Sequence, residues 1–208
     1  MRIYGGNGYI VKAGAKTLRL NNDYTVTYSK NKAVGKASVI IRGKNAYSGK
    51  ITKTFTISKA TKGKTYTVRK FKYTITGAKA DGTGTVAISG TTYTRSDKKF
   101  ASLTISDAVV IGGVKFKITS VGANAFSRYS MMTSVFIGNN VTSIGSNAFV
   151  SCKNLKKVTV KSTKLKGVGA KAFSGTYSKV TFVLPKSKAA SYKKLIKKGN
   201  PPTKAIYK

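Results

Sequence analysis

The sequence motif VGANAF at residues 121–126 decides the fold, because the pattern occurs three times in the chain. It returns as IGSNAF at residues 144–149 and as VGAKAF at residues 168–173. The closing phenylalanines are 23 and then 24 residues apart. That spacing lies within the roughly 20–29 residues per turn of a leucine-rich solenoid. So short a unit cannot bury its own apolar face and must stack on its neighbours, so we expect the three phenylalanines to form one internal column.

Other apolar residues keep the same register around this phrase. Ile118, Val141 and Leu165 precede it at matching positions, and Met132 and Leu155 follow it. The last repeat has a lysine where Met132 and Leu155 stand, as expected for a degraded terminal repeat. The single cysteine, Cys152, falls at an interior corner of its repeat, so we expect a buried structural thiol.

This repeat pattern resembles the BspA-type leucine-rich repeat, an extracellular bacterial family, over about residues 118–184. The basic stretch YKKLIKK at residues 192–198, followed by a proline pair, is similar to the C-termini of that family. The resemblance implies a surface protein that binds partners, with a basic helix after a short solenoid.

The first sixty residues follow a different pattern. Tyr24, Val26 and Tyr28 alternate with threonines, and Ala37, Val39 and Ile41 alternate with other residues, as in half-buried strands. Residues 9–59 resemble the immunoglobulin-like surface modules of large Gram-positive extracellular proteins. The predicted fold is mainly β: an immunoglobulin-like module at 1–59, a β cap or linker at 60–117, and leucine-rich repeats with a basic C-terminal tail at 118–208.

The composition argues against catalysis. The 208 residues include no His, Glu, Gln or Trp, and the acids are only Asp23, Asp81, Asp97 and Asp107. A nucleophilic cysteine needs a neighbouring base, and a Cys/His metal site needs further ligands. We therefore expect a non-enzymatic protein with no catalytic residue, no cofactor and no metal.

Positive charge is the second strong feature. The chain has 40 Lys+Arg against 4 acids, a net charge of +36. This charge either solvates the surface or attracts an anionic wall polymer, a host glycan or nucleic acid. Lysines far outnumber arginines, which favours non-specific polyanion contact over bidentate base recognition. The candidate polyanion-binding residues are Lys153, Lys156, Lys157, Lys161, Lys193, Lys194, Lys197 and Lys198. The spacing of the last four gathers them on one broad side of a helix.

Alternation also predicts an exposed face. If Val158 and Val160 point inward, Thr159 points outward, and Phe136 holds the matching position one repeat earlier. Phe136 and Thr159 are therefore the candidate partner face, for a protein or a glycan. The alternative is that a neighbouring module covers Phe136.

The predicted function is adhesion or interaction at a cell surface, and the alternative is a non-specific nucleic-acid or polyanion binder. No apolar run approaches the ~20 residues of a membrane span. The opening MRIYGG lacks the apolar region of a signal peptide. We thus expect either a cytosolic protein or a segment of a longer secreted one, and the resemblance favours the segment.

Overall fold

The computed structural model describes all residues except 1, 7, 30–34, 58–59 and 80–82. It divides the chain into two compact units, one within residues 1–59 and one from residue 60 onward. The fold is mainly β, and the described residues hold one α-helix, α1 (Ala189–Lys198).

The first unit consists of two three-stranded antiparallel sheets, β1-β2-β3 and β4-β5-β6. Its strands are β1 (Arg2–Gly6), β2 (Gly8–Ala13), β3 (Lys16–Thr17), β4 (Tyr24–Ser29), β5 (Gly35–Gly43) and β6 (Lys50–Ile57). Side chains from both sheets meet in one small core, which includes Val11, Tyr24, Val39 and Ile41. The strands predicted around Tyr24 and Val39 are confirmed, while the immunoglobulin-like character of this unit remains a prediction.

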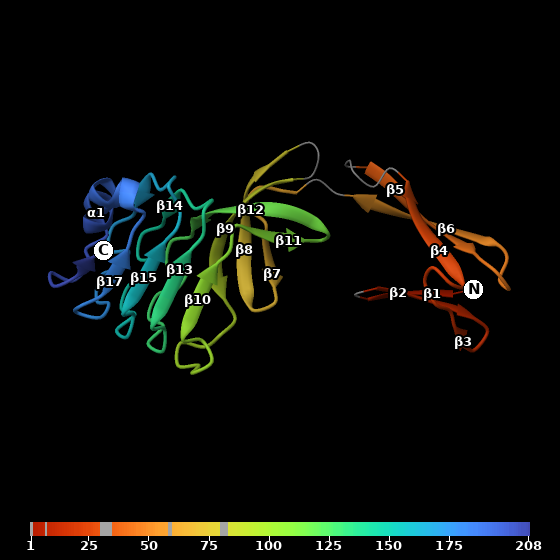
Figure 1. Cartoon of the computed structure of the whole chain (residues 1–208), viewed down its shortest axis with the longest axis horizontal. Helices are drawn as coiled ribbons and strands as arrows, with labels where there is room; N and C mark the ends of the chain where they lie inside the picture. The colour runs from red at the N-terminus through yellow and green to blue at the C-terminus, as the bar shows by residue number, and fades with distance from the viewer. Residues whose placement is uncertain (1, 7, 30–34, 58–59, 80–82) are drawn as a thin grey trace. The chain divides into compact units, whose positions relative to one another are not determined.

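The second unit is built on two sheets (Figure 1). One has seven strands, with β16-β14-β12-β9-β8-β7 in order and β11 paired to β12. The other has five parallel strands in the order β10-β13-β15-β17-β18. The strands are β7 (Thr65–Val68), β8 (Phe71–Ala78), β9 (Gly84–Thr91), β10 (Ser102–Ile105), β11 (Ala108–Ile111), β12 (Val114–Val121), β13 (Ser134–Ile137), β14 (Ser143–Ile144), β15 (Lys157–Val160), β16 (Gly167–Val168), β17 (Thr181–Val183) and β18 (Ile206–Tyr207).

Each repeat places one short strand in each sheet. The middle repeat, for example, runs from β14 through a turn around Phe149 into β15. Successive repeats pair in parallel, β12 with β14 and β14 with β16, while β13 pairs with β15 and β15 with β17. Because the repeats pair in parallel, residues at the same position of successive repeats lie next to one another, and the repeats form a stack.

The predicted phenylalanine column is confirmed. Phe126, Phe149 and Phe173 are fully buried, and their rings stack with centroids 5.7 and 5.6 Å apart and planes within 10° and 8°. Phe100 extends the column on one side at 6.1 Å, and Phe182 closes on the other at 5.0 Å. The rings form one continuous aromatic core from the first turn of the stack to the last.

The second residue of the motif is glycine in all three copies, and in the last two copies close packing between repeats requires it. A Cβ on Gly145 would lie 2.5 Å from the backbone nitrogen of Ala123. At Gly169 it would lie 2.4 Å from the nitrogen of Ser146, distances that real side chains do not reach. Each glycine nitrogen donates to the preceding repeat, from Gly145 to Val121 and from Gly169 to Ile144, both at 2.8 Å. A side chain here would push two repeats apart.

The turn after each glycine uses a left-handed residue at a matching position. Asn124, Asn147 and Lys171 have φ of 57°, 57° and 56°. Asparagine accepts this conformation more readily than most residues. The turns also pair across repeats, since the nitrogen of Asn124 donates to Ser146 O and that of Asn147 to Ala170 O, both at 3.0 Å.

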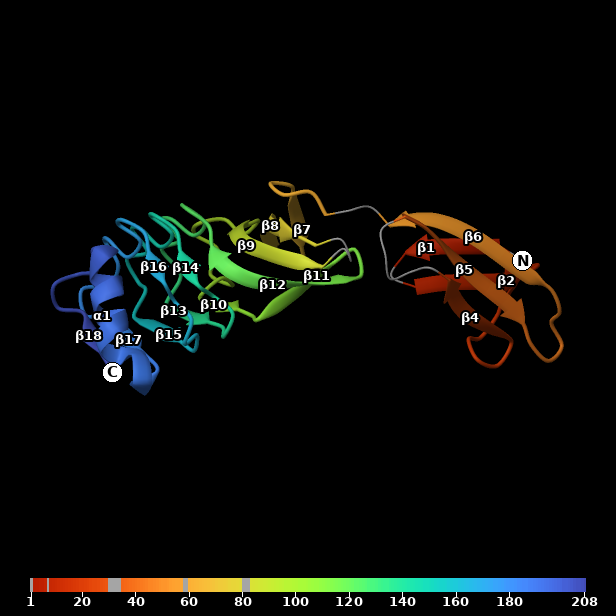
Figure 2. The same cartoon turned by 90° about the horizontal axis from the view of Figure 1, so that it is seen from above.

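The C-terminal segment covers the last repeat (Figure 2). Helix α1 buries Tyr192 and Ile196, and the Tyr192 hydroxyl accepts a hydrogen bond from the Leu165 nitrogen at 2.9 Å. The nitrogen of Phe173, which a further repeat would otherwise pair, donates to Gly199 O at 2.9 Å. Strand β18 adds to β17, and Tyr207 stacks on Phe182 at 5.5 Å.

Parallel stacking begins before the first visible motif. β9 pairs in parallel with β12, and β10 pairs in parallel with β13. This first turn carries no Gly-x-x-Ala-Phe phrase, but Phe100 still continues the column. Residues that the sequence assigns to the cap therefore share one hydrophobic core with the repeats.

Candidate functional site

The outer face of the five-stranded sheet carries the predicted partner residues. Strand register aligns Thr104, Phe136, Thr159 and Val183 in one row across β10, β13, β15 and β17. The residues on either side of Phe136, Val135 and Ile137, are buried, whereas Phe136 is 36% exposed. The predicted outward direction of Phe136 is therefore confirmed.

A second row runs parallel to the first. Ser102, Ser134, Lys157, Thr181 and Ile206 align across the same five strands. Ile206 is 40% exposed, and Lys157 is exposed as well. The face thus presents hydroxyl groups, one aromatic ring, aliphatic side chains and a lysine, with no acidic side chain in either row.

The four predicted lysines of the middle repeat lie in a turn, in β15 and on the two flanks of that strand. Lys153 lies in the turn after Cys152, and Lys161 follows the opposite end of β15 from Lys156. The ammonium of Lys156 lies 5.6 Å from the ring centroid of Tyr177. Of the four, Lys157 is the one that lies within a strand of the five-stranded sheet.

The four predicted helix lysines are divided between two sides of α1. Lys194 and Lys198 line a pocket. Lys193 instead lies over the ring of Tyr207, with its ammonium 5.3 Å from the centroid, and Lys197 is exposed outside the pocket lining. The α-helical period of 3.6 residues separates the two pairs by about 100°.

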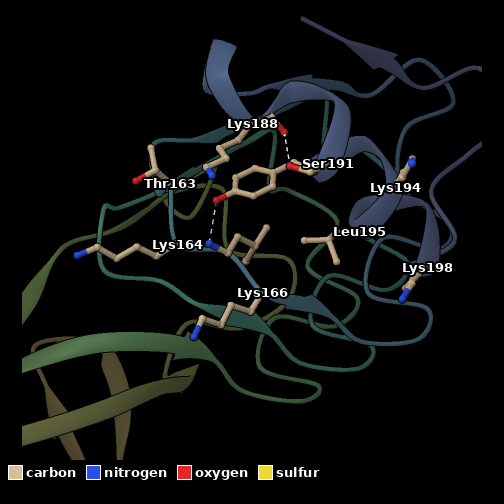
Figure 3. Close-up of a pocket in the computed structure, with 10 residues that line it drawn as sticks. Thr163, Lys164, Lys166, Lys188, Ser191, Lys194, Leu195 and Lys198 are labelled. Atoms are coloured by element: carbon tan, nitrogen blue, oxygen red, sulfur yellow. Dashed lines mark hydrogen bonds between the residues drawn. The ribbon is translucent and has the colours of Figure 1, made fainter.

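The pocket between α1 and the last repeat has a volume of about 670 Å³ (Figure 3). Five lysines line it, and sequence reasoning identified only two of them. They are Lys164, Lys166, Lys188, Lys194 and Lys198. Lys164 and Lys166 flank Leu165 before β16, and Lys188 precedes α1. Their separation in the sequence gives no local pattern, so only the docking of the helix brings them together.

Cys152 has the properties of a structural residue. It is fully buried, and its thiol donates to Phe126 O at 3.0 Å. Burial raises the pKa of the Cys152 thiol to about 11, which opposes the thiolate that nucleophilic chemistry requires. The predicted interior position is confirmed.

The described aspartates also serve local structure. Asp23 accepts the Arg19 backbone N–H at 2.8 Å, and Asp97 accepts that of Lys99 at 2.9 Å. Asp107 accepts the backbone N–H of Asn139 at 2.6 Å and its side-chain amide at 3.0 Å. These hydrogen bonds from Asn139 lower the pKa of Asp107. Asp81 lies outside the described residues.

Within the part of the chain that the structure describes, no group of three or more His, Cys, Asp or Glu side chains is placed to hold a metal ion. None of the described helices is both long enough and apolar enough to span a membrane.

Solved structures that the chain resembles include two that are described as leucine-rich. A leucine rich cell surface protein from Faecalibacterium prausnitzii A2-165 shares 26% identity with a TM-score of 0.44, covering 59% of this chain and 37% of that one. A leucine-rich repeat protein from Bacteroides ovatus ATCC 8483 shares 20% identity with a TM-score of 0.42, covering 68% and 37%. The pneumococcal vaccine antigen PcpA shares 18% identity with a TM-score of 0.41, covering 59% and 41%. The chain therefore spans between 37% and 41% of the length of these proteins.

Sequence comparison identifies the repeats directly. No curated protein sequence matches the chain. The family model of the BspA type leucine rich repeat region (6 copies) matches residues 88–197, which is more than half of the 208 residues. The match begins within β9, where the structure also begins its parallel stacking. By its repeats, their stacking and this match, the chain belongs to the BspA-type leucine-rich repeat family.

Proposed function

We propose that this protein is a non-enzymatic interaction protein of a bacterial cell surface, and that its five-stranded parallel sheet binds a protein or glycan partner. In this proposal the repeats with their C-terminal tail form the binding part of the chain. The immunoglobulin-like unit at 1–59 acts as a spacer, and β7 and β8 cap the stack, whose first turn is formed by β9 and β10. Membership of the BspA-type family supports a surface interaction role.

The observation that carries the proposal is the outward row of Thr104, Phe136, Thr159 and Val183. An exposed aromatic ring is the kind of side chain that interface cores favour, and the uncharged residues beside Phe136 in the row fit the depletion of charged residues from such cores. Helix α1 packs against β16 of the other sheet, so the row is left open by the helix.

Repetition also suits this face to an extended partner. Adjacent parallel strands are about 4.8 Å apart, so the row offers a regular series of contacts along the stack. A solenoid commonly uses such a surface for binding, since each added repeat lengthens it without changing the core.

The experiment measures binding to an array of immobilised extracellular proteins and glycans. Phe136→Ser should weaken binding to the partner that the unmodified protein selects by about tenfold, the usual effect of losing a central aromatic contact. Val110→Ser is the matched control, because Val110 is 55% exposed but lies on β11, in the other sheet. Equal binding by both variants and the unmodified protein would refute the sheet as the binding face.

The second candidate function is attachment to an anionic polymer. The observation that favours it is the lysine-lined pocket beside α1. The two functions use different parts of the surface and are compatible in one protein.

A further inference from the structure

We propose that the pocket between α1 and the last repeat binds a base-free phosphodiester polymer, a chain of phosphates linked by a polyol or sugar. This site lies apart from the sheet that carries the proposed partner face. The inference rests on the second candidate function, attachment to an anionic polymer. It adds the location of the site, its lining residues and the class of ligand.

The first argument is charge. Five lysine residues line the pocket, and no acidic residue is among its lining residues. No acidic residue follows Asp107 in the chain. Lys164 contributes to lowering the pKa of Asp107, after the larger contribution of the Asn139 hydrogen bonds. The other four lysines have no described acidic partner, so an anionic ligand is the group that can neutralise them.

The second argument is size. The pocket volume of about 670 Å³ is within the ~300–1,000 Å³ of typical ligand sites. A single phosphate ion is far smaller, since a water molecule occupies only about 30 Å³ of liquid. Charge from five lysines over this volume fits several linked phosphates better than one ion.

The third argument is the pocket wall. Leu165 and the half-buried Leu195 supply apolar surface between the lysines. Such a surface suits the carbon atoms that link phosphates in a polyol or sugar phosphate. The cations are all lysines, which act as point charges, and no arginine is present to read a planar group bidentately.

The same wall argues against nucleic acid. Binding of single strands relies on exposed aromatic rings on which bases stack. The one aromatic residue of the lining, Tyr192, is 2% exposed, and its hydroxyl accepts the Leu165 N–H at 2.9 Å. Its ring is therefore not free to stack on a base.

The pocket is also held in shape before any ligand arrives. The Tyr192–Leu165 hydrogen bond joins the helix to the segment that carries Lys164 and Lys166, and Ile196 is buried on the same helix. Ser191 Oγ donates to Lys188 O at 2.9 Å at the start of the helix (Figure 3). Both walls are fixed to the core, so binding does not have to assemble them.

The experiment uses three fluorescently labelled probes: a glycerol phosphate hexamer, inorganic tripolyphosphate and hexathymidylate. Affinity is measured by anisotropy at several salt concentrations on the full chain. The pocket variant is Lys194→Gln with Lys198→Gln. Its matched control is Lys193→Gln with Lys197→Gln, which removes the same charge at the same spacing from the other side of the same helix.

We expect the pocket variant to lose about tenfold or more in affinity for the glycerol phosphate hexamer, because two close charge contacts are removed. The control should lose less than about threefold, since distant exposed charges are screened beyond about 8 Å at physiological salt. The dependence of affinity on salt should also become shallower only in the pocket variant.

Three outcomes would overturn the proposal. Equal losses of hexamer affinity in both variants would show that the lysines act through a diffuse electrostatic field and that no dedicated site exists. If the unmodified protein did not measurably bind the hexamer, the pocket would not be a site for this class of ligand. Tighter, pocket-dependent binding of hexathymidylate would assign the pocket to nucleic acid. Phe136→Ser should leave hexamer binding unchanged, so failure of this inference is distinguishable from failure of the sheet as partner face. Thermal unfolding of every variant confirms that the fold is intact.

Discussion

Replacing Phe149 by alanine removes the centre of the aromatic column. Phe149 is fully buried, and its ring stacks on Phe126 at 5.7 Å and on Phe173 at 5.6 Å. No other ring of the column lies between two stacked neighbours of adjacent repeats in this way. The substitution therefore cuts the core between the first and last parts of the solenoid.

The expected cost is about 3–5 kcal/mol, the usual range for Phe→Ala in a core. The loss combines transfer of the ring to water, the cavity left behind, and two aromatic contacts worth about 0.5–1.5 kcal/mol each. Ladder hydrogen bonds limit collapse, because the Phe149 nitrogen donates to Ala172 O at 2.9 Å and holds the repeats at their spacing. The cavity should thus remain largely open.

Thermal unfolding followed by circular dichroism measures the effect. For a domain of roughly 150–250 residues, 1 kcal/mol shifts Tm by about 2–4 °C, so Phe149→Ala should lower Tm by about 6–20 °C. The first unit has its own core, so its transition should not move. Phe136→Ala is the control, since Phe136 is 36% exposed and its truncation leaves no enclosed cavity, so its Tm should fall by less than that of Phe149→Ala. A Tm for Phe149→Ala equal to that of the control would refute the stacked column.

The remaining predictions concern backbone packing, the thiol and acid stability. Gly145→Ala should lower the free energy of unfolding, measured in urea, by about 1–3 kcal/mol. Gly122→Ala should lower it by less, because a Cβ on Gly122 would lie no closer than 3.2 Å to Ser89 Cα. Equal losses in the two variants would contradict the explanation by close approach. The buried Cys152, with its pKa raised to about 11, should react slowly with a soluble thiol reagent in the native state and quickly in denaturant, and fast native labelling would contradict its interior position. The lowered pKa of Asp107 means that its stabilisation is present above its ordinary pKa and is lost as pH falls through the folded pKa. Unfolding measured from neutral to strongly acidic pH should therefore show less acid destabilisation in Asp107→Asn, and an unchanged pH profile would contradict this assignment.

Periodicity made the core predictable from the sequence. Phe126, Phe149 and Phe173 recur in the same phrase, and equal units stacked in parallel must place equal residues in contact. The burial of Cys152 and the exposure of Phe136 follow from the same register. These properties depend on residues close in the chain, repeated in one environment, so local pattern is sufficient to determine them.

The first turn of the stack could not be found in this way. β9 and β10 take their places through pairing with β12 and β13, without the phrase that marks later repeats. The glycines of the motif are visible in the sequence, but the reason for them is the approach of Gly145 to Ala123 in the preceding repeat. Such contacts join residues more than twenty positions apart, and no short pattern records them.

The same contrast between local sequence pattern and contacts of distant residues applies to the two candidate sites. The sequence by itself determined that the chain is a basic repeat protein with an outward row containing Phe136 and Thr159, because alternation along a strand is a local property. Only the tertiary structure decided which lysines line a common pocket. Lys194 and Lys198 line the same pocket as Lys164, Lys166 and Lys188, whereas Lys193 lies over Tyr207. The physical reason is that the docking of α1, set by the burial of Tyr192 and Ile196, orients the helix about its axis and thereby selects which of its lysines line the pocket.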